Sequence, residues 1–462
     1  MDSVGMKSSA PESLRRELGF KDGLAIVVGT VIGSGIFLVP GPIAQQLHSF
    51  STVLLVWIIG SLLSLAGSLS LAELATLYPG AGGLYVYLRH AFGKFPGFLY
   101  GWGLLVMIQT GSIATLASGF TLYFARLIPL SPLAHKAVPI VFILLLTTMN
   151  CLGLRLGKLI QNVSTVSKVA GLLFLLVLLL WRGHLHVLTA SMQWSRPSFS
   201  GLLPFGVAMV AVLWAFEGWH VVSFTAAEFR SPARDIPKSL MWGTLACALI
   251  YILLNVGYYS VLTPHAISMT GQAAATAVHS IYGSGITALV SVLILTSILG
   301  AANGMILTGP RVYYAMAQDG IFFSGFSKVH PKFGVPLLAI VIQGIWASLL
   351  TLMGSFQQLF TYVIFTAWIF YGLTVVALIV LRIRRPSAKR AFRVPAYPWV
   401  PIAFVLAAIG IVISTMINDP FHSALGIAVI LAGAPIYFIF QFRARSSDTA
   451  AQAPVSSSEP PE

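Results

Sequence analysis

Residues 28–42 read VGTVIGSGIFLVPGP, an apolar run in which two glycines flank a serine. Inside a bilayer every backbone donor and acceptor needs a partner, so a broken helix is tolerated there only around a cavity. Gly33 and Gly35, with Pro40 downstream, predict that the helix unwinds beside Ser34 and exposes free amide groups. The half-helix beyond the break would turn the positive end of its dipole toward the cavity, which suits a carboxylate. Close packing against a neighbouring helix would explain the small residues equally well.

A second interruption lies in residues 213–224, which read LWAFEGWHVVSF. Glu217 is deep in this apolar run and is followed by Gly218. A carboxylate at that depth costs at least about 2.5 kcal/mol even on lenient insertion scales. A cationic partner, a proton or a polar cavity must offset that cost, and a protonated glutamic acid bonded to a neighbouring helix is the alternative.

The chain has 462 residues, of which 57% are hydrophobic and only 9% are charged. A soluble domain carries about 25% charged residues because its surface faces water, so the composition indicates a lipid environment. Twelve apolar runs are long enough to cross a bilayer, which takes roughly 20 residues. They cover residues 23–47, 51–77, 96–125, 137–154, 161–181, 200–227, 239–262, 284–316, 336–354, 358–381, 399–417 and 421–441. We therefore predict an all-α polytopic membrane protein with twelve transmembrane helices.

Basic residues are distributed unevenly over the loops between these runs. Loops on the side of the two termini carry 22 Lys and Arg residues, whereas loops on the other side carry four: Arg126, Lys136, Arg182 and Arg196. Positive loops stay in the cytoplasm, which predicts a multi-pass protein of the cytoplasmic (inner) membrane with both termini inside. The net charge of +14 is therefore a topology signal that requires no nucleic acid. The polar first 22 residues predict no removable signal peptide.

The two breaks fall in the first and sixth runs. That spacing is typical of an inverted five-helix repeat, with the substrate site between two discontinuous helices. The predicted parts are a cytoplasmic segment (1–22), two inverted repeats (23–182 and 200–382) and two further helices (399–441). A disordered tail (446–462) follows them. A zwitterion fits the predicted site, because free amides at 33–36 would bind its carboxylate and Glu217 or nearby carbonyls its ammonium.

A buried positive charge is predicted in the fifth run, at Lys168 in QNVSTVSKVAGLLFLL. An ammonium in the fifth run must be paired, neutralised or solvated. Its long side chain could reach the cytoplasmic edge, about two turns away. The functional interpretation is that its charge occupies the place of a coupling cation, so that transport would not need sodium. The two cysteines, Cys151 and Cys247, indicate neither a metal site nor a disulfide framework, and we expect no cofactor.

Several blocks of sequence occur in an order that resembles a known family. They are VIGSGIF (31–37), PGAGGLYVYLRHAFG (79–93), NCLGLRLGKLIQNVSTVSK (150–168), WAFEGW (214–219) with EFRSPARDIPKS (228–239), NGMILTGPRVYYAMAQDG (303–320), and AWIFYG (367–372) followed by RPSAKRAFRVPAYP (385–398). Together they resemble the amino acid–polyamine–organocation (APC) superfamily, and within it the L-type branch of light subunits of heteromeric amino acid transporters and their bacterial relatives. The resemblance covers about residues 20–442.

The resemblance implies a LeuT-like fold, a 5+5 inverted repeat plus two C-terminal helices, with helices 1 and 6 discontinuous. It implies a sodium-independent transporter of L-amino acids that works by alternating access. Its substrates would be neutral amino acids, with cationic ones as a possible extension of the range. The unwound first-helix segment that binds the substrate carboxylate is matched by Gly33, Ser34, Gly35 and Ile36. The sixth-helix segment, whose aromatic residues gate the path and whose carbonyls bind the ammonium, is matched by Trp214, Ala215, Phe216, Glu217 and Gly218. The lysine at the sodium position is matched by Lys168, and eighth- and tenth-helix positions near the pocket by Asn303 and Trp368. Gln109 and Thr110 on the third run line the pocket or serve packing.

The sequence departs from the family at two places. Eukaryotic light subunits carry a cysteine between the third and fourth helices, bonded to a heavy chain, whereas ARLIPLSPLAHKAVP (125–139) has none. We therefore expect no disulfide-linked heavy subunit. The family often has a small residue at the position of Glu217, and members with an acid there handle cationic as well as neutral side chains.

Three other functions are alternatives to amino acid exchange. A proton-coupled polyamine or cationic amino acid transporter would use Glu217 to bind an amine. A membrane-embedded enzyme would need a catalytic cluster of His, Asp or Glu, and the sequence has no such motif. A channel would need a ring of charges or a filter repeat, and none is visible. We expect a transporter of amino acids rather than an enzyme.

Overall fold

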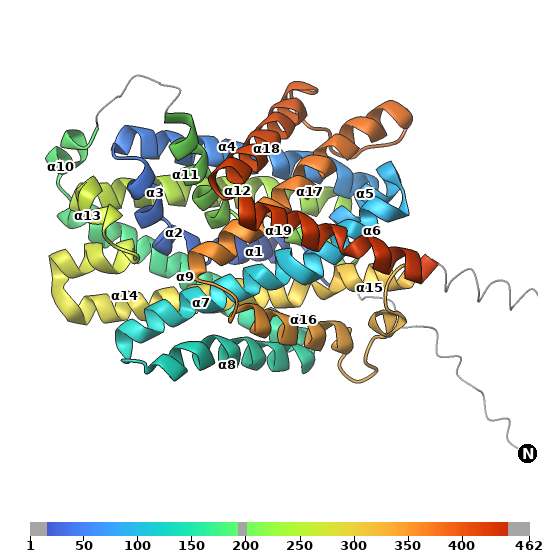
Figure 1. The fold of residues 1–462 in the computed structure, drawn as a ribbon, viewed down its shortest axis with the longest axis horizontal. Coiled ribbons are helices and arrows are strands. Elements are labelled where there is room, and N and C mark those ends of the chain that lie inside the picture. Colours follow the sequence, from blue (N-terminus) through green and yellow to red (C-terminus); the bar gives the residue numbers. More distant parts are fainter. Residues whose placement is uncertain (1–15, 193–200, 442–462) are drawn as a thin grey trace, which may run out of the picture.

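The computed structural model describes residues 16–192 and 201–441 (Figure 1). The predicted tail at 446–462 and most of the predicted segment 1–22 lie outside the described residues. Within them the chain is helical throughout, and the only extended pairing is a single parallel bridge between Leu18 and Phe229.

The helices of the first half are α1 (Phe20–Val31), α2 (Gly35–Leu38), α3 (Pro40–Gln46), α4 (Phe50–Leu77), α5 (Leu84–Phe92), α6 (Lys94–Gly103), the π-helix η1 (Leu104–Ile108), α7 (Gln109–Leu127), α8 (Pro132–Cys151), α9 (Leu154–Arg182) and α10 (Leu185–Ala190). Those of the second half are α11 (Leu202–Ala215), the 3-10 helix η3 (Val221–Glu228), α12 (Pro232–Val261), α13 (Pro264–Ser268), α14 (Ala273–Thr308), α15 (Pro310–Gln318), the 3-10 helix η4 (Ser324–Ser327), α16 (Leu337–Leu350), α17 (Phe356–Arg384), α18 (Trp399–Asn418) and α19 (Pro420–Leu431).

Ten helical stretches in the described residues are long and apolar enough to cross a membrane, which makes the chain a multi-pass membrane protein. The sixth and ninth predicted runs correspond to shorter apolar helices, α11 and α16, of 14 residues each. At 1.5 Å per residue, neither reaches across a hydrocarbon core of about 30 Å by itself. The number twelve therefore stays a prediction.

The eighth predicted run, 284–316, begins at a kink. α14 begins at Ala273 and α15 continues the same stretch to Gln318, but the non-helical Gly283 divides α14 into two helices, and the second begins where the run was predicted to begin. Gly283 sits inside α14 with φ of +74°, a conformation that glycine adopts without the cost other residues meet. The extra turns before this bend carry too few large apolar residues to be recognised as part of a span.

The broken first helix lies at the centre of the protein (Figure 1). The apolar window of Phe20–Leu38 is 78% buried, whereas those of Pro132–Cys151 and Trp399–Asn418 are 28% buried. Since a helix that faces lipid keeps one side uncovered by protein, α8 and α18 belong to the periphery. The core around α1 is made by α9, α12 and α14, which all contact it.

Candidate functional site

The first helix is interrupted between α1 and α2. Within the described residues, the backbone N–H groups of Ser34, Gly35 and Ile36 make no backbone hydrogen bond. The side chain of Ser34 is fully buried, and its Oγ also lacks a partner there. Unpaired buried polar groups are costly, so this cluster of donors indicates a place for an acceptor.

The second interruption follows α11, which ends at Ala215. Residues 216–220 form turns, and the chain continues as the 3-10 helix η3 instead of a second α-helical half. Gly218 has φ of +110°, which a residue with a Cβ adopts only with strain. The predicted discontinuity is thus present in both helices.

The two breaks are in direct contact. A Cβ added to Gly35 would lie 2.8 Å from the Cβ of Ala215. The Thr30 hydroxyl of α1 donates to the Gly218 carbonyl over 3.1 Å. Tyr251 of α12 has its hydroxyl 2.9 Å from the carbonyl oxygens of both Val31 and Ala215. One phenol has a single proton, so Tyr251 ties the ends of α1 and α11 together by sharing it.

A small cavity lies between the breaks, with a volume of about 10 Å³, which is roughly enough for one water molecule. It is lined by Thr30, Val31, Gly33, Ser34, Gly35, Leu116, Trp214, Glu217 and Met305. Five of these were singled out from the sequence. The indole Nε1 of Trp214 is buried without a partner among the described residues, so a donor from the second break joins the donors of the first.

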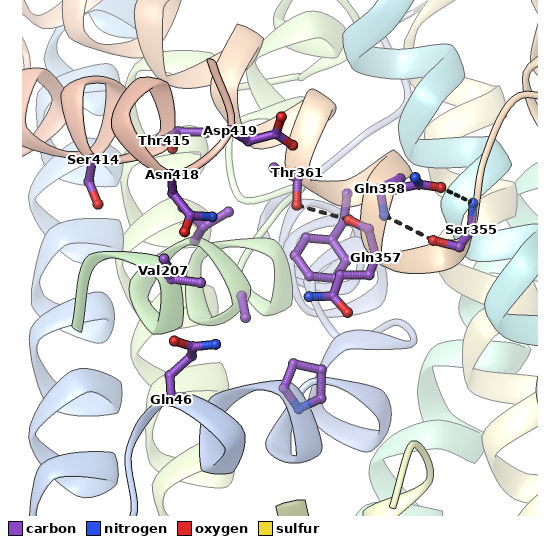
Figure 2. A pocket seen from close by; sticks show the side chains of 14 residues that line it. Gln46, Val207, Ser355, Gln357, Gln358, Thr361, Ser414, Thr415, Asn418 and Asp419 are labelled. Atoms are coloured by element: carbon purple, nitrogen blue, oxygen red, sulfur yellow. Dashed lines mark hydrogen bonds between the residues drawn. The ribbon is translucent and has the colours of Figure 1, made fainter. Parts of the chain in front are cut away.

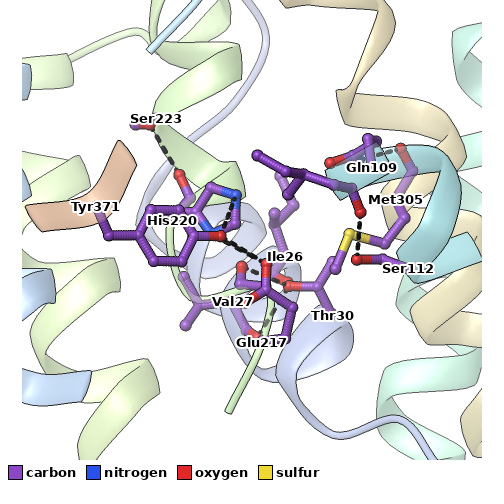
Figure 3. Close-up of polar contacts among 12 residues, drawn as sticks. Ile26, Val27, Thr30, Gln109, Ser112, Glu217, His220, Ser223, Met305 and Tyr371 are labelled. Atoms are coloured by element: carbon purple, nitrogen blue, oxygen red, sulfur yellow. Dashed lines mark hydrogen bonds and ion pairs between the residues drawn. The ribbon is translucent and has the colours of Figure 1, made fainter. Parts of the chain in front are cut away.

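Glu217 belongs to a buried polar group that sequence reasoning did not find. The Tyr371 hydroxyl of α17 donates to Glu217 Oε1 over 2.6 Å and lies 3.1 Å from His220 Nδ1 (Figure 3). His220 Nδ1 is 3.8 Å from Glu217 Oε1. No Lys or Arg pairs with Glu217 in the described part of the chain, so the cost of burying it is offset by a hydroxyl, an imidazole and the cavity edge.

Lys168 of α9 points at the break in the first helix. Its Nζ donates to the carbonyls of Gly29 and Ile32, both over 2.6 Å, and the residue is 1% exposed. A lysine that reached for the cytoplasmic edge would be exposed there. The side chain instead bonds the carbonyls at the end of α1, which are the kind of oxygen ligands that a metal cation takes.

A cluster of aromatic rings separates the cavity from an outer pocket. Trp214 packs on Phe360 and Phe356 of α17, with ring centroids 6.0 and 6.2 Å apart. Phe360 also lines a pocket of about 300 Å³ between α3, α11, α17 and α18, whose lining is labelled in Figure 2 and is polar there except for Val207. The ring of Phe360 thus contacts Trp214 on one side and lines this pocket on the other.

The other end of the structure is closed by buried and half-buried polar contacts. Arg311 Nε of α15 bonds Glu228 Oε1 of η3 over 3.0 Å, with both side chains 2% exposed. Lys158 of α9 pairs with Asp22 of α1 over 2.9 Å.

Further contacts on the same side involve α5, which lies outside the apolar stretches. Arg89 forms an ion pair with Asp319, and the Tyr85 hydroxyl donates to the same carboxylate over 2.6 Å. Burial, followed by this bond to Asp319, raises the pKa of Tyr85 well above its usual range. Tyr85 therefore stays protonated and remains a donor at neutral pH.

The remaining predicted residues do not line the cavity. The Phe216 ring packs on Trp57 and Tyr251, and the Trp368 ring stacks on Phe404. Asn303 donates to Gln161 and Gly157 in a buried network with Asn150. These positions are within the core, but their side chains are directed into helix packing.

Other predicted residues contribute to the frame. Gln109 donates to the Met305 carbonyl over 2.7 Å, and Thr110 of α7 donates to the Leu105 carbonyl of the preceding π-helix η1. Ile36 and Ala215 are fully or almost fully buried beside the breaks. Thr30, Leu116 and Met305 line the cavity but carry no sequence signal that distinguishes them from core residues. No group of three His, Cys, Asp or Glu residues that could hold a metal ion is found in the described ranges.

Comparisons with known proteins match almost the whole chain. The amino acid permease family model matches residues 18–440. The serine/threonine exchanger SteT of Bacillus subtilis is 34% identical over 92% of this chain and 97% of its own length. The b(0,+)-type amino acid transporter 1 of Rattus norvegicus is 31% identical over 95% of this chain and 91% of its own. The human cystine/glutamate transporter is 27% identical over 92% of this chain and 85% of its own length.

Proposed function

Because this chain belongs to the amino acid permease family of the APC superfamily, we propose that it exchanges L-amino acids across the cytoplasmic membrane without using sodium. Amino acid transport follows from its relatives, which are amino acid transporters and which this chain matches along almost their whole length. Exchange is the activity in the name of the relative from Bacillus subtilis.

The observation that carries the proposal is the pair of broken helices with unpaired donors between them. The N–H groups of Ser34 to Ile36 and the Ser34 hydroxyl lack partners in the described residues, and a substrate carboxylate would supply them. The end of α11 presents backbone carbonyls and the Glu217 carboxylate, which would bind the ammonium. The two charged ends of one zwitterion would therefore bridge the two breaks.

The cavity must enlarge to admit a substrate. At about 10 Å³ it holds no amino acid, so we infer that the structure is a closed state of an alternating-access cycle. Entry from the pocket beside Phe360 requires displacement of one aromatic layer around Trp214. Entry from the opposite side requires separation of Glu228 from Arg311 and of Asp22 from Lys158. The aromatic layer is the easier barrier to open because no buried ion pair crosses it.

The topology that we propose keeps the sequence-based scheme. Twelve spans would comprise two inverted repeats, 23–182 and 200–382, followed by the two helices of 399–441. Both termini would be cytoplasmic, since the loops on that side carry most of the basic residues. Both cysteines are free, Cys247 buried and Cys151 half-buried, and the loop at 125–139 has none. We therefore propose that no heavy subunit is linked through a disulfide.

Lys168 supports the proposal that sodium is not needed. Its ammonium already satisfies the carbonyls of Gly29 and Ile32, so a sodium ion would have to displace a fixed positive charge. We expect uptake to be unchanged when external sodium is replaced by choline. A rise in uptake of several-fold on adding sodium would contradict this.

Exchange is tested with proteoliposomes that contain the purified chain. Radiolabelled serine outside should accumulate when the vesicles are loaded with unlabelled amino acid, and uptake into empty vesicles should be at the level of protein-free liposomes. Equal uptake into empty and loaded vesicles would exclude obligatory exchange. A panel of internal amino acids would then define the substrate range.

A polyamine carrier is the second candidate, and the buried Glu217 carboxylate favours it. The two functions differ in what the amides at Ser34 to Ile36 bind. A free amino acid should compete for uptake, whereas its methyl ester, which lacks the carboxylate charge, should not. Equal competition by the ester and by putrescine would favour the polyamine carrier.

Glu217→Gln should lower uptake of lysine relative to leucine by roughly tenfold, because a hydrogen bond to a charged group contributes about 1.5–3 kcal/mol. Glutamine still accepts the bond from the Tyr371 hydroxyl, so the substitution removes the charge and keeps the local contact. The pH profile of uptake should also flatten, since glutamine does not exchange a proton. An unchanged lysine-to-leucine ratio at every pH would exclude both roles of Glu217.

A further inference from the structure

A pocket lined by arginines lies at the end of α17, away from the two breaks. It has a volume of about 250 Å³ and is lined by Arg382, Ile383, Pro386, Arg390, Arg393 and Tyr397. We call it the arginine pocket. The neighbouring Arg384 donates to the Ala91 carbonyl of α5, which places the pocket on the side of the protein where α5 lies.

Glu73 of α4 holds two of these arginines in place. Arg382 Nε donates to Glu73 Oε1 over 2.8 Å, and Arg390 Nε lies 3.1 Å from the same oxygen. The backbone N–H of Val394 donates to Glu73 Oε2 over 2.8 Å. Glu73 is fully buried, so it fixes both guanidinium groups and the loop between α17 and α18 before any ligand arrives.

The arginine pocket has more positive charge than Glu73 neutralises. Arg382 and Arg390 both pair with Glu73, and no second acid pairs with these two arginines or with Arg393 in the described part of the chain. Arg393 is exposed and makes no hydrogen bond or ion pair with a described residue. Arg390 already donates to the carbonyls of Leu381, Arg385 and Ala388, so it contributes charge, whereas the donors of Arg393 are free within the described residues. Surplus positive charge beside free guanidinium donors is the arrangement that binds phosphate groups.

Exposed apolar side chains also occur at the pocket and close to it in the sequence. Ile383, which lines it, is 71% exposed, and Trp399, the first residue of α18, is 73% exposed. Large apolar side chains at this exposure are expected to face lipid, and tryptophan concentrates at the membrane–water interface. The Arg382 guanidinium lies 3.9 Å from the centroid of the Tyr397 ring, so an aromatic surface also borders the cationic group.

We propose that the arginine pocket binds the phosphate group of an anionic phospholipid whose acyl chains lie along Ile383 and Trp399. The combination of surplus guanidinium charge and exposed apolar side chains suits an amphiphile better than a free phosphate, which gains nothing from Trp399. Basic pockets at the ends of membrane helices bind lipid headgroups through this combination of contacts. The site is separate from the proposed amino acid site and does not depend on it.

The test uses the full chain, purified in detergent and titrated with phosphatidylglycerol or phosphatidylcholine under native mass spectrometry. The wild-type chain should retain phosphatidylglycerol in preference to phosphatidylcholine. Arg393→Gln should weaken phosphatidylglycerol binding about fivefold, since each basic residue near a lipid surface contributes about 1 kcal/mol. Because Arg393 has no described partner, this variant leaves the Glu73 contacts intact.

Arg234→Gln is the matched control, because Arg234 is an exposed arginine of α12 outside the pocket and its replacement removes the same charge. It should bind phosphatidylglycerol as the wild type does. Equal binding by the wild type and Arg393→Gln would overturn the proposal, and so would equal losses in the two variants. Competition by inorganic phosphate at the same concentration as the lipid would assign the pocket to a free anion instead.

Discussion

Gly35→Ala is expected to reduce amino acid uptake roughly tenfold to 100-fold. A Cβ at this position would overlap the Cα of Ala215 and lie 3.2 Å from its backbone N. Backbone atoms at the end of α11 cannot rotate away as a side chain would, so the two broken helices must separate. Overpacking of this kind costs about 1–3 kcal/mol, and it falls on the contact that sets the spacing of the proposed carboxylate and ammonium sites. Initial rates of serine exchange in proteoliposomes measure the effect.

Gly33→Ala provides the control in the same break. Its Cβ would come within 2.9 Å of Leu116 Cδ2 and 3.1 Å of Ala301 Cβ, and the end of a leucine side chain can move. Uptake should therefore fall by less than in Gly35→Ala. If both variants transport at the wild-type rate, close contact between the breaks does not control transport. Monodisperse elution of each variant in detergent would separate lost transport from lost folding.

Lys168→Ala is expected to lower uptake roughly 100-fold while the protein still folds. The ammonium donates to two carbonyls at the end of α1, and each hydrogen bond to a charged group contributes about 1.5–3 kcal/mol. Without it the carbonyls of Gly29 and Ile32 lose a partner next to the break, and the geometry of the carboxylate site is no longer fixed. Lys168→Met, which keeps the aliphatic volume, should be equally impaired.

Lys158→Ala is the matched control on the same helix. Lys158 pairs with Asp22, and the two side chains are 34% and 24% exposed, so this pair contributes at most about 1 kcal/mol. Uptake by this variant should stay close to that of the wild type. Full activity of Lys168→Ala would mean that its bonds to α1 are not needed for transport. A gain of sodium-dependent uptake in Lys168→Ala would instead strengthen the proposal that its charge replaces a cation.

The sequence located the break in each helix but not the partners that complete them. Gly33 and Gly35 are recognisable because they flank a serine inside an apolar run, and Gly218 because it follows the buried charge of Glu217. Tyr251, Tyr371 and His220 were missed, since one tyrosine or histidine in a span resembles many others. Trp368 was expected near the pocket from its motif, and its ring packs on Phe404 and on Tyr371, the residue that bonds Glu217.

The ends of the apolar runs also set the predicted limits of the spans. The runs corresponding to α4 and α17 were recognised to within a few residues because each is apolar around its whole circumference. The run at 284–316 begins directly after Gly283, the kink that divides α14, because the alanine and polar residues before it are not hydrophobic enough to extend the run.

The sequence by itself determined that this protein is inserted in a membrane and where its first and sixth helices break. The reason is that the cost of burying charge and unpaired backbone depends on local composition. Only the tertiary structure decided which donors face one cavity, that Lys168 bonds the end of α1, and that Tyr371 and His220 surround Glu217. Except for His220, which is three positions from Glu217, those contacts join residues more than 100 positions apart, and their distances depend on how whole helices pack, which no local pattern encodes.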